Sequence, residues 1–332
     1  MRILSACAVL LGAALTLPAA KNLEIYAIDV EGGQATLFVS PSGDSMLIDT
    51  GWGGFNSRDA LRILAAAKAA GVKKIDYLVT THYHADHVGG IAQLAAKIPI
   101  RNFVDHGENV ENTKPIKVLY NEYIDFRGKG THIQVKPGDT IPVKGLEVKV
   151  LSAAGQVLAG PATGPANPEC AGFKLHDGDP TENAQSVGLL ITYGSFRVVD
   201  LGDLTWNKEK DLVCPTNRIG PISLYLVSHH GSDESGSPEL LHALQPKVAL
   251  MDNGAKKGGA PITWQTIHDT PSVQDIWQLH FAYAGGQEHN AAAPFLANLD
   301  DICEGKWIRV DAQKDGTFQL YNSRNKYEKT YR

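Results

Sequence analysis

The chain has 332 residues and a formal net charge of −5, from 31 basic and 36 acidic side chains. With 43% hydrophobic and 20% charged residues it can bury a sizeable core, which excludes wholesale disorder. The acidic balance does not support a surface that follows a long polyanion, so no dedicated nucleic-acid-binding surface is indicated. The length suits one large α/β domain or two small ones.

The first twenty residues differ from the rest of the chain. Arg2 supplies a positive start, residues 3–17 are an uninterrupted apolar run, and a Pro-Ala-Ala sequence follows. This pattern is typical of a secretory signal peptide, and the run is too short for a membrane span. We expect an exported protein, periplasmic or secreted, with residues 1–20 removed, residues 21–332 folded as a single domain, and no transmembrane domain after cleavage. A buried N-terminal helix, or a lipoprotein cleavage box at Cys7, is the alternative.

Export makes a disulfide possible. After the predicted signal peptide three cysteines remain, Cys170, Cys214 and Cys303, and an odd number allows at most one internal pair. Cys170 and Cys214 both lie in irregular, proline-containing segments, where a covalent link is most useful. The sequence therefore predicts a Cys170–Cys214 disulfide and a free, buried Cys303.

Alternating strand and helix patterns follow in chain order. To residue 152 they predict strands at 23–30, 34–39 and 45–49, a helix capped by Asn56 or Ser57 and ended by Gly71, a strand at 74–80, a helix near 91–98, a strand at 102–104, and antiparallel strands within 132–152. Further on they predict strands at 187–193, 195–200 and 223–227, a helix at 239–244, a strand at 247–251, and a hairpin of 307–310 with 317–321. Between them, about residues 153–185 form a long loop, either functional or a surface insertion. This order suggests two sheets sandwiched between helices.

One short motif carries most of the chemistry. Residues 81–90 read THYHADHVGG, with three histidines and an aspartate within six residues: His82, His84, Asp86 and His87. A core rarely holds so many imidazoles, because each needs hydrogen-bond partners. A loop leaving a strand end can instead direct His82 and His84 to one metal ion and Asp86 and His87 to another. Imidazole and carboxylate ligands suit zinc, manganese or iron. We therefore expect two divalent metal ions, Zn²⁺ first and Mn²⁺ as the alternative.

The motif resembles the His-x-His-x-Asp-His signature of the metallo-β-lactamase superfamily. Three further segments resemble that family in order: LIDTG at 47–51, VDLGD at 199–203 and VSHHGS at 227–232. The resemblance implies an α/β protein with a four-layer αββα sandwich. It also implies that Asp49 holds a ligand histidine in place and that Asp203 bridges two metals.

The last histidine ligand has two candidates, His229 and His230. A strand running to Ser228 places His229 first at its end, so His229 is the expected ligand. His230 is then the expected proton donor to a leaving group and, with Asp86, a catalytic residue. The segment ending at Ser232 can offer backbone N–H groups to an anion, which makes Ser232 a candidate substrate-binding residue.

Within the superfamily, other pieces resemble the nuclease-like domain of the bacterial DNA-uptake competence channel. They are VEGGQ at 30–34, the His-His-Gly-Ser sequence and the Pro-Gly-Asp turn at 137–139. The apolar membrane segments of that channel are not found, so we do not expect DNA transport.

One feature departs from the family pattern. The superfamily usually has a further histidine before the bridging aspartate, but the corresponding region, 181–186, has none. Asn183 or Ser186 is expected near the metals there, and His106 is a possible extra ligand, with His176 a weaker candidate. The site with His82 and His84 is then held less tightly, and function with one metal is an alternative.

Three more residues are candidates for substrate binding. Lys256 and Lys257 form either an anion clamp or a solvated basic turn. His280 lines the pocket rim or is a structural residue. Together these features predict an exported hydrolase that uses a metal-bound hydroxide on phosphodiesters or other small anionic substrates, including short oligonucleotides. The alternatives are a lactonase or β-lactamase acting on carbonyl substrates, and a non-catalytic metal-binding protein.

Overall fold

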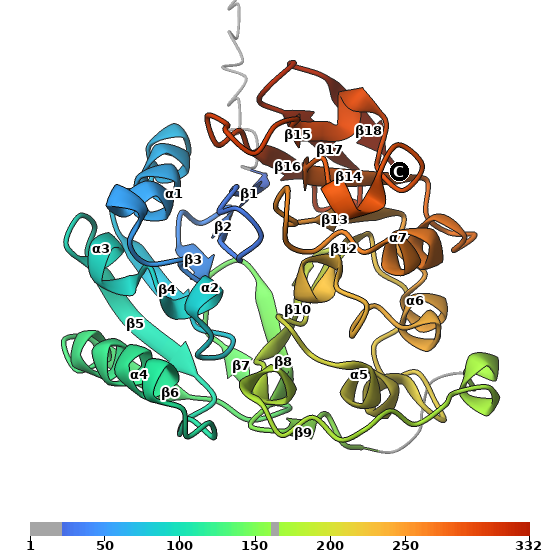
Figure 1. Cartoon of the computed structure of the whole chain (residues 1–332), viewed down its shortest axis with the longest axis horizontal. Helices are drawn as coiled ribbons and strands as arrows, with labels where there is room; N and C mark the ends of the chain where they lie inside the picture. Colours follow the sequence, from blue (N-terminus) through green and yellow to red (C-terminus); the bar gives the residue numbers. More distant parts are fainter. Residues whose placement is uncertain (1–21, 161–165) are drawn as a thin grey trace, which may run out of the picture.

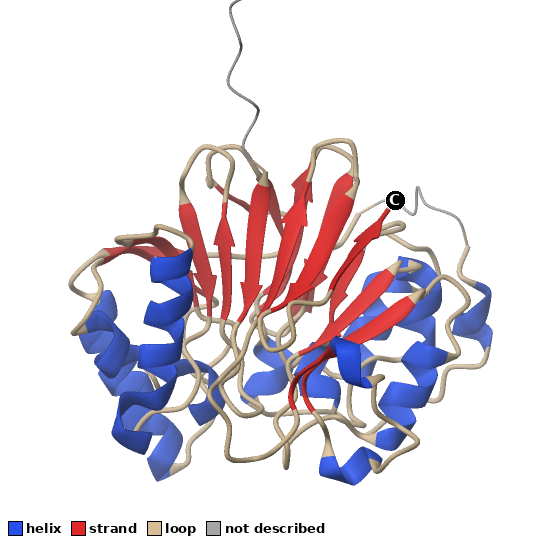
Figure 2. Cartoon of the chain, turned by 90° about the horizontal axis from the view of Figure 1, so that it is seen from above, coloured by secondary structure: helices blue, strands red, loops and turns tan. Residues whose placement is uncertain are grey.

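A computed structural model describes residues 22–160 and 166–332, so the predicted signal peptide at 1–20 lies outside the described residues. Two sheets face each other at the centre of the molecule, and helices cover both outer faces (Figure 1 and Figure 2). Within the described part of the chain, no helix has the length and hydropathy needed to cross a membrane.

The first sheet has the order β18-β17-β16-β1-β2-β3-β4-β5-β6. Pairing is antiparallel from β18 to β3 and parallel from β3 to β6. Its strands are β1 (Leu23–Ala27), β2 (Thr36–Val39), β3 (Ser45–Ile48), β4 (Ile75–Val79), β5 (Ile100–Asp105), β6 (Thr131–Gln134), β16 (Ile308–Ala312), β17 (Phe318–Asn322) and β18 (Glu328–Tyr331).

The second sheet has the order β15-β14-β13-β12-β11-β10-β8-β7, with β9 paired to β8. Pairing is antiparallel from β7 to β11 and parallel from β11 to β15. Its strands are β7 (Thr140–Ile141), β8 (Glu147–Ala153), β9 (Gln156–Val157), β10 (Gly188–Tyr193), β11 (Phe196–Asp200), β12 (Leu224–Leu226), β13 (Val248–Met251), β14 (Asp275–His280) and β15 (Leu296–Asn298).

The helices divide between the two sheets (Figure 1). Residues of α1 to α4 pack in one hydrophobic cluster with the first sheet, and residues of α5 to α7 in another with the second sheet. The helices are α1 (Arg58–Ala69), α2 (Ala85–Val88), α3 (Ile91–Ala95), α4 (Lys114–Arg127), α5 (Trp206–Val213), α6 (Pro238–Leu244) and α7 (Pro261–His268).

A third cluster lies between the two sheets and unites apolar side chains from both, such as Phe38 and Val79 of the first with Val198 and Leu250 of the second. Three apolar interfaces therefore separate four layers. Each sheet is covered on both faces, which explains why its central strands are almost continuously apolar. The predicted αββα sandwich is confirmed.

The prediction for residues 132–152 was partly wrong. Strand β6 pairs parallel with β5 in the first sheet, whereas β7 and β8 belong to the second sheet. The turn at 137–139 therefore carries the chain from one sheet to the other. An alternating pattern reveals a strand but not its neighbour, so the sequence could not distinguish a hairpin from this crossing.

The longest helix, α4, was not predicted. Tyr120 and Tyr123 are buried, and Leu119, Ile124 and Phe126 pack partly buried beside them, so the helix has an apolar stripe that the sequence analysis overlooked. The predicted long loop contains β9 and two 3₁₀ segments, Pro168–Ala171 and Glu182–Gln185, while residues 161–165 lie outside the described chain.

The parallel strands deliver the chemical groups to one edge. The histidine motif follows β4, Asp203 follows β11, and the His229–His230 pair follows β12. Carboxyl ends of parallel strands meet at the same edge of a sheet, and open α/β sheets bind their ligands there. This topology brings together side chains that lie more than a hundred residues apart.

The predicted disulfide between Cys170 and Cys214 is confirmed, with Cα atoms 5.7 Å apart. It links the Pro168–Ala171 segment to the end of α5. Cys303 is free, but it is only partly buried.

Removing this disulfide should destabilise the fold. The bond closes a loop with a sequence separation of 44 residues, for which chain entropy alone corresponds to about 4 kcal/mol. We expect the Cys170→Ser, Cys214→Ser double variant to unfold at a clearly lower urea concentration than the oxidised protein. Reducing agent should shift the wild type to the variant's midpoint and leave the variant unchanged. Equal midpoints for the oxidised wild type and the variant would contradict this account.

Candidate metal centre

Four buried side chains from three stretches of chain form a compact group: Asp86, His87, Asp203 and His230. Their ligand atoms all lie within 4.8 Å of one another. The Nε2 atom of His87 is 3.3 Å from Asp86 Oδ2 and 3.2 Å from Asp203 Oδ2. The Nε2 atom of His230 is 3.2 Å from Asp86 Oδ2. Two carboxylates and two imidazoles thus converge on one point.

A second group adjoins the first at Asp203. The Nε2 atom of His82 is 3.0 Å from His84 Nδ1 and 3.9 Å from Asp203 Oδ2. His229 Nε2 approaches the same carboxylate oxygen at 3.3 Å. Asp203 is therefore shared by both groups, in the position that the family resemblance implies for a bridging residue.

Hydrogen bonds fix the ring tautomers of His82 and His84. Nε2 of His84 is 2.8 Å from Glu111 Oε1, so it carries the proton and Nδ1 presents a lone pair. The Thr81 hydroxyl donates to Asp49 at 2.6 Å, so it can only accept from His82 Nδ1, 3.1 Å away. The lone pairs of His82 Nε2 and His84 Nδ1 then face each other. Such an arrangement is repulsive unless a cation lies between them.

The other group repeats this pattern. His87 Nδ1 donates to Asp49 Oδ2 at 2.7 Å, so Nε2, which lies 3.2 Å from His230 Nε2, is the ring nitrogen that can bind a metal. On its far side, His230 Nδ1 lies 3.2 Å from Asp252 Oδ1. Asp203 Oδ1 is buried and accepts no hydrogen bond from the part of the chain that the structure describes. The donor set fits two divalent cations, with carboxylates behind the imidazoles as metal sites require.

The charges also suit cations. Burial favours the neutral form of Asp86 and Asp203, but nearby imidazoles, His87 first, outweigh it and hold the pKa of both carboxyls well below the usual value. At His87 burial lowers the pKa, but the carboxylates of Asp203, Asp86 and Asp49 outweigh it and raise the pKa well above its ordinary value, so a metal ion would replace a proton there. Burial, followed by the charge of His87, lowers the pKa of His82 well below its ordinary value. Ionised carboxylates and a neutral imidazole are the protonation states in which these groups bind metals.

The backbone is strained where it presents these groups. Asp49, His229 and His230 have φ angles of 59°, 53° and 54°, in the left-handed region that side chains with a Cβ avoid. Each such residue costs of order 1–3 kcal/mol and persists only where the surrounding structure holds it. Close packing also explains the glycines after the motif, since a Cβ on Gly90 would lie 2.1 Å from the carbonyl oxygen of Thr50.

Several other predicted residues lie beside the centre. Ser186 Oγ is 3.5 Å from His82 Nδ1 and accepts from the Asp203 backbone. Lys257 forms an ion pair with Asp86, and its Nζ lies 5.5 Å from the centre of the Trp52 ring. His106 Nε2 is 3.0 Å from Glu182 Oε2, and the same carboxylate oxygen accepts a hydrogen bond from the backbone N–H of Tyr83 in the motif.

Other predicted residues are placed elsewhere. Lys256 is exposed and pairs with Asp301 at 2.6 Å, so the expected clamp consists of Lys257 alone. His280 is buried against Asp29 rather than lining a pocket rim. The backbone oxygen of Ser232 accepts a hydrogen bond from the Thr263 hydroxyl group.

Sequence reasoning missed three carboxylates that support the centre: Glu111, Glu182 and Asp252. Asp252 had a usable signal, because it directly follows β13 at the edge where the other parallel strands deliver their groups. Glu111 lies in a loop and Glu182 begins a 3₁₀ segment, and neither belongs to a pattern that relates it to the motif.

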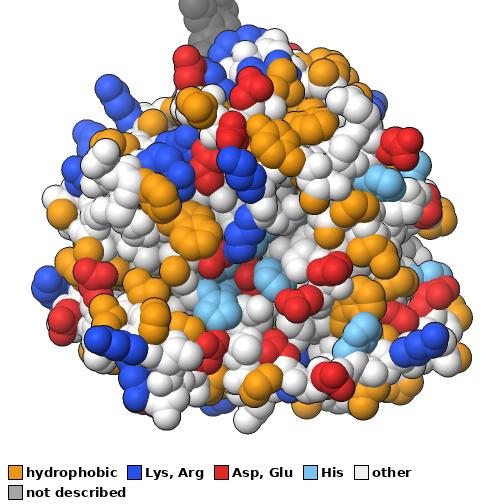
Figure 3. Space-filling view, in the orientation of Figure 1, with side chains coloured by type: hydrophobic (Ala, Val, Ile, Leu, Met, Phe, Trp, Pro, Cys, Tyr) orange, Lys and Arg blue, Asp and Glu red, His pale blue; other side chains and the backbone are white. Residues whose placement is uncertain are grey.

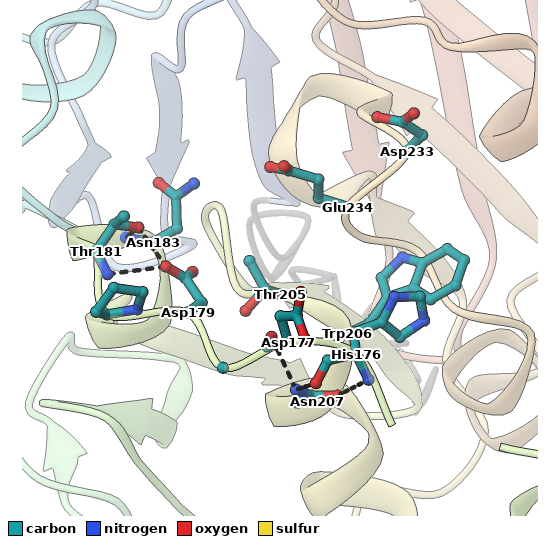
Figure 4. A pocket seen from close by; sticks show the side chains of 12 residues that line it. His176, Asp177, Asp179, Thr181, Asn183, Thr205, Trp206, Asn207, Asp233 and Glu234 are labelled. Atoms are coloured by element: carbon teal, nitrogen blue, oxygen red, sulfur yellow. Dashed lines mark hydrogen bonds between the residues drawn. The ribbon is translucent and has the colours of Figure 1, made fainter. Parts of the chain in front are cut away.

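The centre opens to the surface. Figure 3 shows histidines and acidic side chains at the bottom of a central hollow. A pocket of about 430 Å³ adjoins it, and Figure 4 shows its lining. Asn183 lines it, and its buried Oδ1 has no hydrogen-bond partner among the described residues. Glu234 also lines it, 3.9 Å from His229 Nδ1.

The pocket has two distinct features. One wall is aromatic, with the rings of His176 and Trp206 4.4 Å apart. The rest is acidic, with the carboxylates of Asp177, Asp179, Asp233 and Glu234. These carboxylates give the pocket negative charge, whereas Lys257 places a positive charge beside Asp86.

The sequence matches the metallo-beta-lactamase superfamily over residues 28–170. The chain carries a domain of this superfamily. ComE operon protein 3 of Bacillus subtilis is 27% identical over 245 residues, which cover 70% of this chain and 28% of that protein. A hydroxyacylglutathione hydrolase of Rhodopseudomonas palustris is 35% identical over 100 residues, 30% of this chain and 32% of that protein. A ribonuclease Z of Methanopyrus kandleri is 28% identical over 117 residues, 34% of this chain and 37% of that protein. The chain therefore spans well under half the length of each relative.

Substitution of Asp49 by asparagine tests the support of this metallo-β-lactamase centre. Both Asp49 oxygens accept hydrogen bonds, from the Thr81 backbone, the Thr81 hydroxyl and His87 Nδ1. An amide nitrogen in place of Oδ2 would face the His87 N–H and favour the tautomer protonated on Nε2, which cannot bind a metal. We expect Asp49→Asn to weaken metal affinity about 10–100-fold, measured by competition with a chromogenic chelator. The exposed Lys256→Ala is the control, and an unchanged affinity in Asp49→Asn would refute the assignment.

Proposed function

We propose that this protein is an exported hydrolase that holds two divalent metal ions, with Zn²⁺ as the preferred metal, and cleaves small phosphodiesters. The observation that carries the proposal is the buried Asp203 carboxylate, shared by two groups of imidazoles whose ring nitrogens face one another at 3.0 and 3.2 Å. When bound, two such ions supply Lewis acidity and lower the pKa of a coordinated water from about 15.7 toward about 7.

In this proposal His229 replaces the family histidine that the sequence lacks. His82, His84, Asp203 and His229 hold one ion, since both His82 and His229 approach Asp203 Oδ2. Asp86, His87, Asp203 and His230 hold the other. His230 is then a ligand rather than the proton donor that the sequence suggested, and Asp252 orients its ring.

Lys257 and the pocket set the substrate class. The ammonium group of Lys257, beside Asp86, can bind one negatively charged phosphate group. The acidic pocket repels further phosphates, while the faces of His176 and Trp206 offer a surface for a planar leaving group. A phosphodiester with one negative charge and a flat organic substituent matches both Lys257 and the pocket. Small phosphodiesters or very short oligonucleotides are therefore favoured over long nucleic acids.

The second candidate is hydrolysis of uncharged carbonyl substrates such as lactones. Two observations favour it: the acidic pocket, which tolerates neutral substrates, and the 35% identity to a hydroxyacylglutathione hydrolase over 100 residues. The third reading, a non-catalytic metal-binding protein, rested on the missing histidine. The approach of His229 to Asp203 weakens that argument.

A substrate panel separates these candidates. We expect the protein, loaded with Zn²⁺ and then with Mn²⁺, to hydrolyse a chromogenic phosphodiester faster than single-stranded DNA, a lactone or a chromogenic β-lactam. Chelation should abolish turnover, and Asp203→Asn should reduce kcat at least about 100-fold because it removes a charge shared by both sites. Turnover of the lactone or the β-lactam alone would overturn the ranking, and two retained metals without any turnover would favour the binding protein.

The charge of the pocket should control selectivity. Asp177→Asn together with Asp233→Asn removes two negative charges from the lining without touching a proposed ligand. We expect the KM for a dinucleotide carrying an additional terminal phosphate to fall several-fold at low salt, with kcat little changed, and the gain to shrink at high salt. Asp125→Asn, on the exposed face of α4, is the matched control. An equal KM in the double variant and the control would show that the pocket does not contact this substrate.

A further inference from the structure

A second cluster of metal-ligating side chains lies outside the candidate metal centre. It consists of Asp29, Glu31, His280 and Cys303, whose ligand atoms all lie within 4.8 Å of one another. Asp29 and Glu31 follow β1 of the first sheet, His280 ends β14 of the second, and Cys303 follows β15. Four ligands of three chemical types, from three separate segments, therefore meet where the two sheets adjoin.

The imidazole and the thiol each lie close to both carboxylates and to one another. His280 Nε2 is 2.8 Å from Asp29 Oδ1 and 3.3 Å from Glu31 Oε2. Cys303 Sγ is 3.2 Å from Asp29 Oδ2, 3.3 Å from Glu31 Oε1 and 3.8 Å from His280 Nε2. Ligands at about 2.0–2.3 Å from a tetrahedral ion lie roughly 3.3–3.8 Å apart, so only small movements are needed to enclose one ion.

The protons available do not satisfy this arrangement. A thiol has one proton, yet Cys303 Sγ contacts an oxygen of each carboxylate. His280 Nε2 has at most one proton and also contacts both carboxylates. The single proton of each group therefore has to be shared between two carboxylates, which leaves both contacts weak. A central cation attracts all four atoms at once.

We propose that Asp29, Glu31, His280 and Cys303 form a third metal site, which takes Zn²⁺ and has a structural role. One thiolate, one imidazole and two carboxylates form a mixed set that suits zinc. Four protein ligands close the coordination sphere, which is typical of structural rather than catalytic zinc. Binding releases the Cys303 proton and any proton on His280 Nε2.

Arg62 of α1 completes the site from outside. Its Nη1 is 2.7 Å from Asp29 Oδ2 and 3.0 Å from Glu31 Oε1, and its Nη2 is 3.2 Å from the Cys303 carbonyl oxygen and 3.3 Å from Cys303 Sγ. The guanidinium orients both carboxylates through hydrogen bonds, as supporting partners of metal ligands do. With Zn²⁺ bound, two carboxylates and a thiolate balance the ion and Arg62, so the buried cluster is neutral.

The location suggests what this site stabilises. The loop from Asp29 continues through Gly32, where a Cβ would lie 2.8 Å from that of Lys257, to Gln34, whose backbone N–H donates to the Asp86 carbonyl at 3.1 Å. An ion that ties this loop to β14 also fixes the segment against which Lys257 and Asp86 pack. The third site therefore holds the two halves of the molecule together beside the candidate metal centre.

Cobalt substitution tests the site without an activity assay. The candidate metal centre contains no cysteine among its described ligands, and Cys170 and Cys214 are joined, so in a Cys7→Ser background Cys303 is the only thiol. We expect thiolate-to-cobalt charge-transfer absorption in this protein and its retention in Asp203→Asn, which affects only the other centre. Cys303→Ser should lose it together with one of three bound metals per chain, and His280→Gln should lose the same metal.

Thiol reactivity supplies a second measurement for variants that fold poorly. Zn²⁺ should protect Cys303 from alkylation at least about tenfold in the otherwise unaltered chain, and a chelator should remove the protection. Absence of both the cobalt–thiolate absorption and the protection would show that Asp29, Glu31, His280, Cys303 and Arg62 form only a network of ion pairs, and would overturn the proposal.

Discussion

The buried carboxylate of Asp203 is the constraint on which the rest of the structure depends. It is ionised at the meeting point of two sheets, and the Nε2 atoms of four imidazoles, those of His82, His87, His229 and His230, lie 3.2–3.9 Å from its oxygens. Without compensating positive charge, a buried anion of this kind is strongly destabilising. The tautomers fixed by Asp49 and Glu111, and the strained backbone at His229 and His230, are all consistent with a fold built to enclose cations.

The sandwich explains why such a centre can exist. Each half contributes parallel strands whose carboxyl ends meet at one edge, so β4 and β11 present their groups to the same space from opposite sheets. The apolar interior between the sheets keeps the distance between them fixed. Positioning of this kind on rigid strands is what metal chemistry requires, because ligand distances tolerate only small errors.

The sequence predicted the layers and most residues of the candidate metal centre because their signals are local. His82, His84, Asp86 and His87 lie within six residues, and the strands that support them are short apolar runs bounded by turns. It could not predict the partner of β6 or the role of Glu111, because pairing and loop contacts depend on distant residues. The cluster of Asp29 and His280 was missed for the same reason, since their 251-residue separation leaves no motif.

The central claim is that Asp203 lies between two metal ions with His229 on one side and His230 on the other. Anomalous diffraction from crystals grown with Zn²⁺ tests it most directly. The account predicts two anomalous peaks flanking the Asp203 carboxylate, one bonded to His82, His84 and His229 and the other to Asp86, His87 and His230. Absence of any peak within bonding distance of Asp203, with the histidines joined by hydrogen bonds instead, would contradict it.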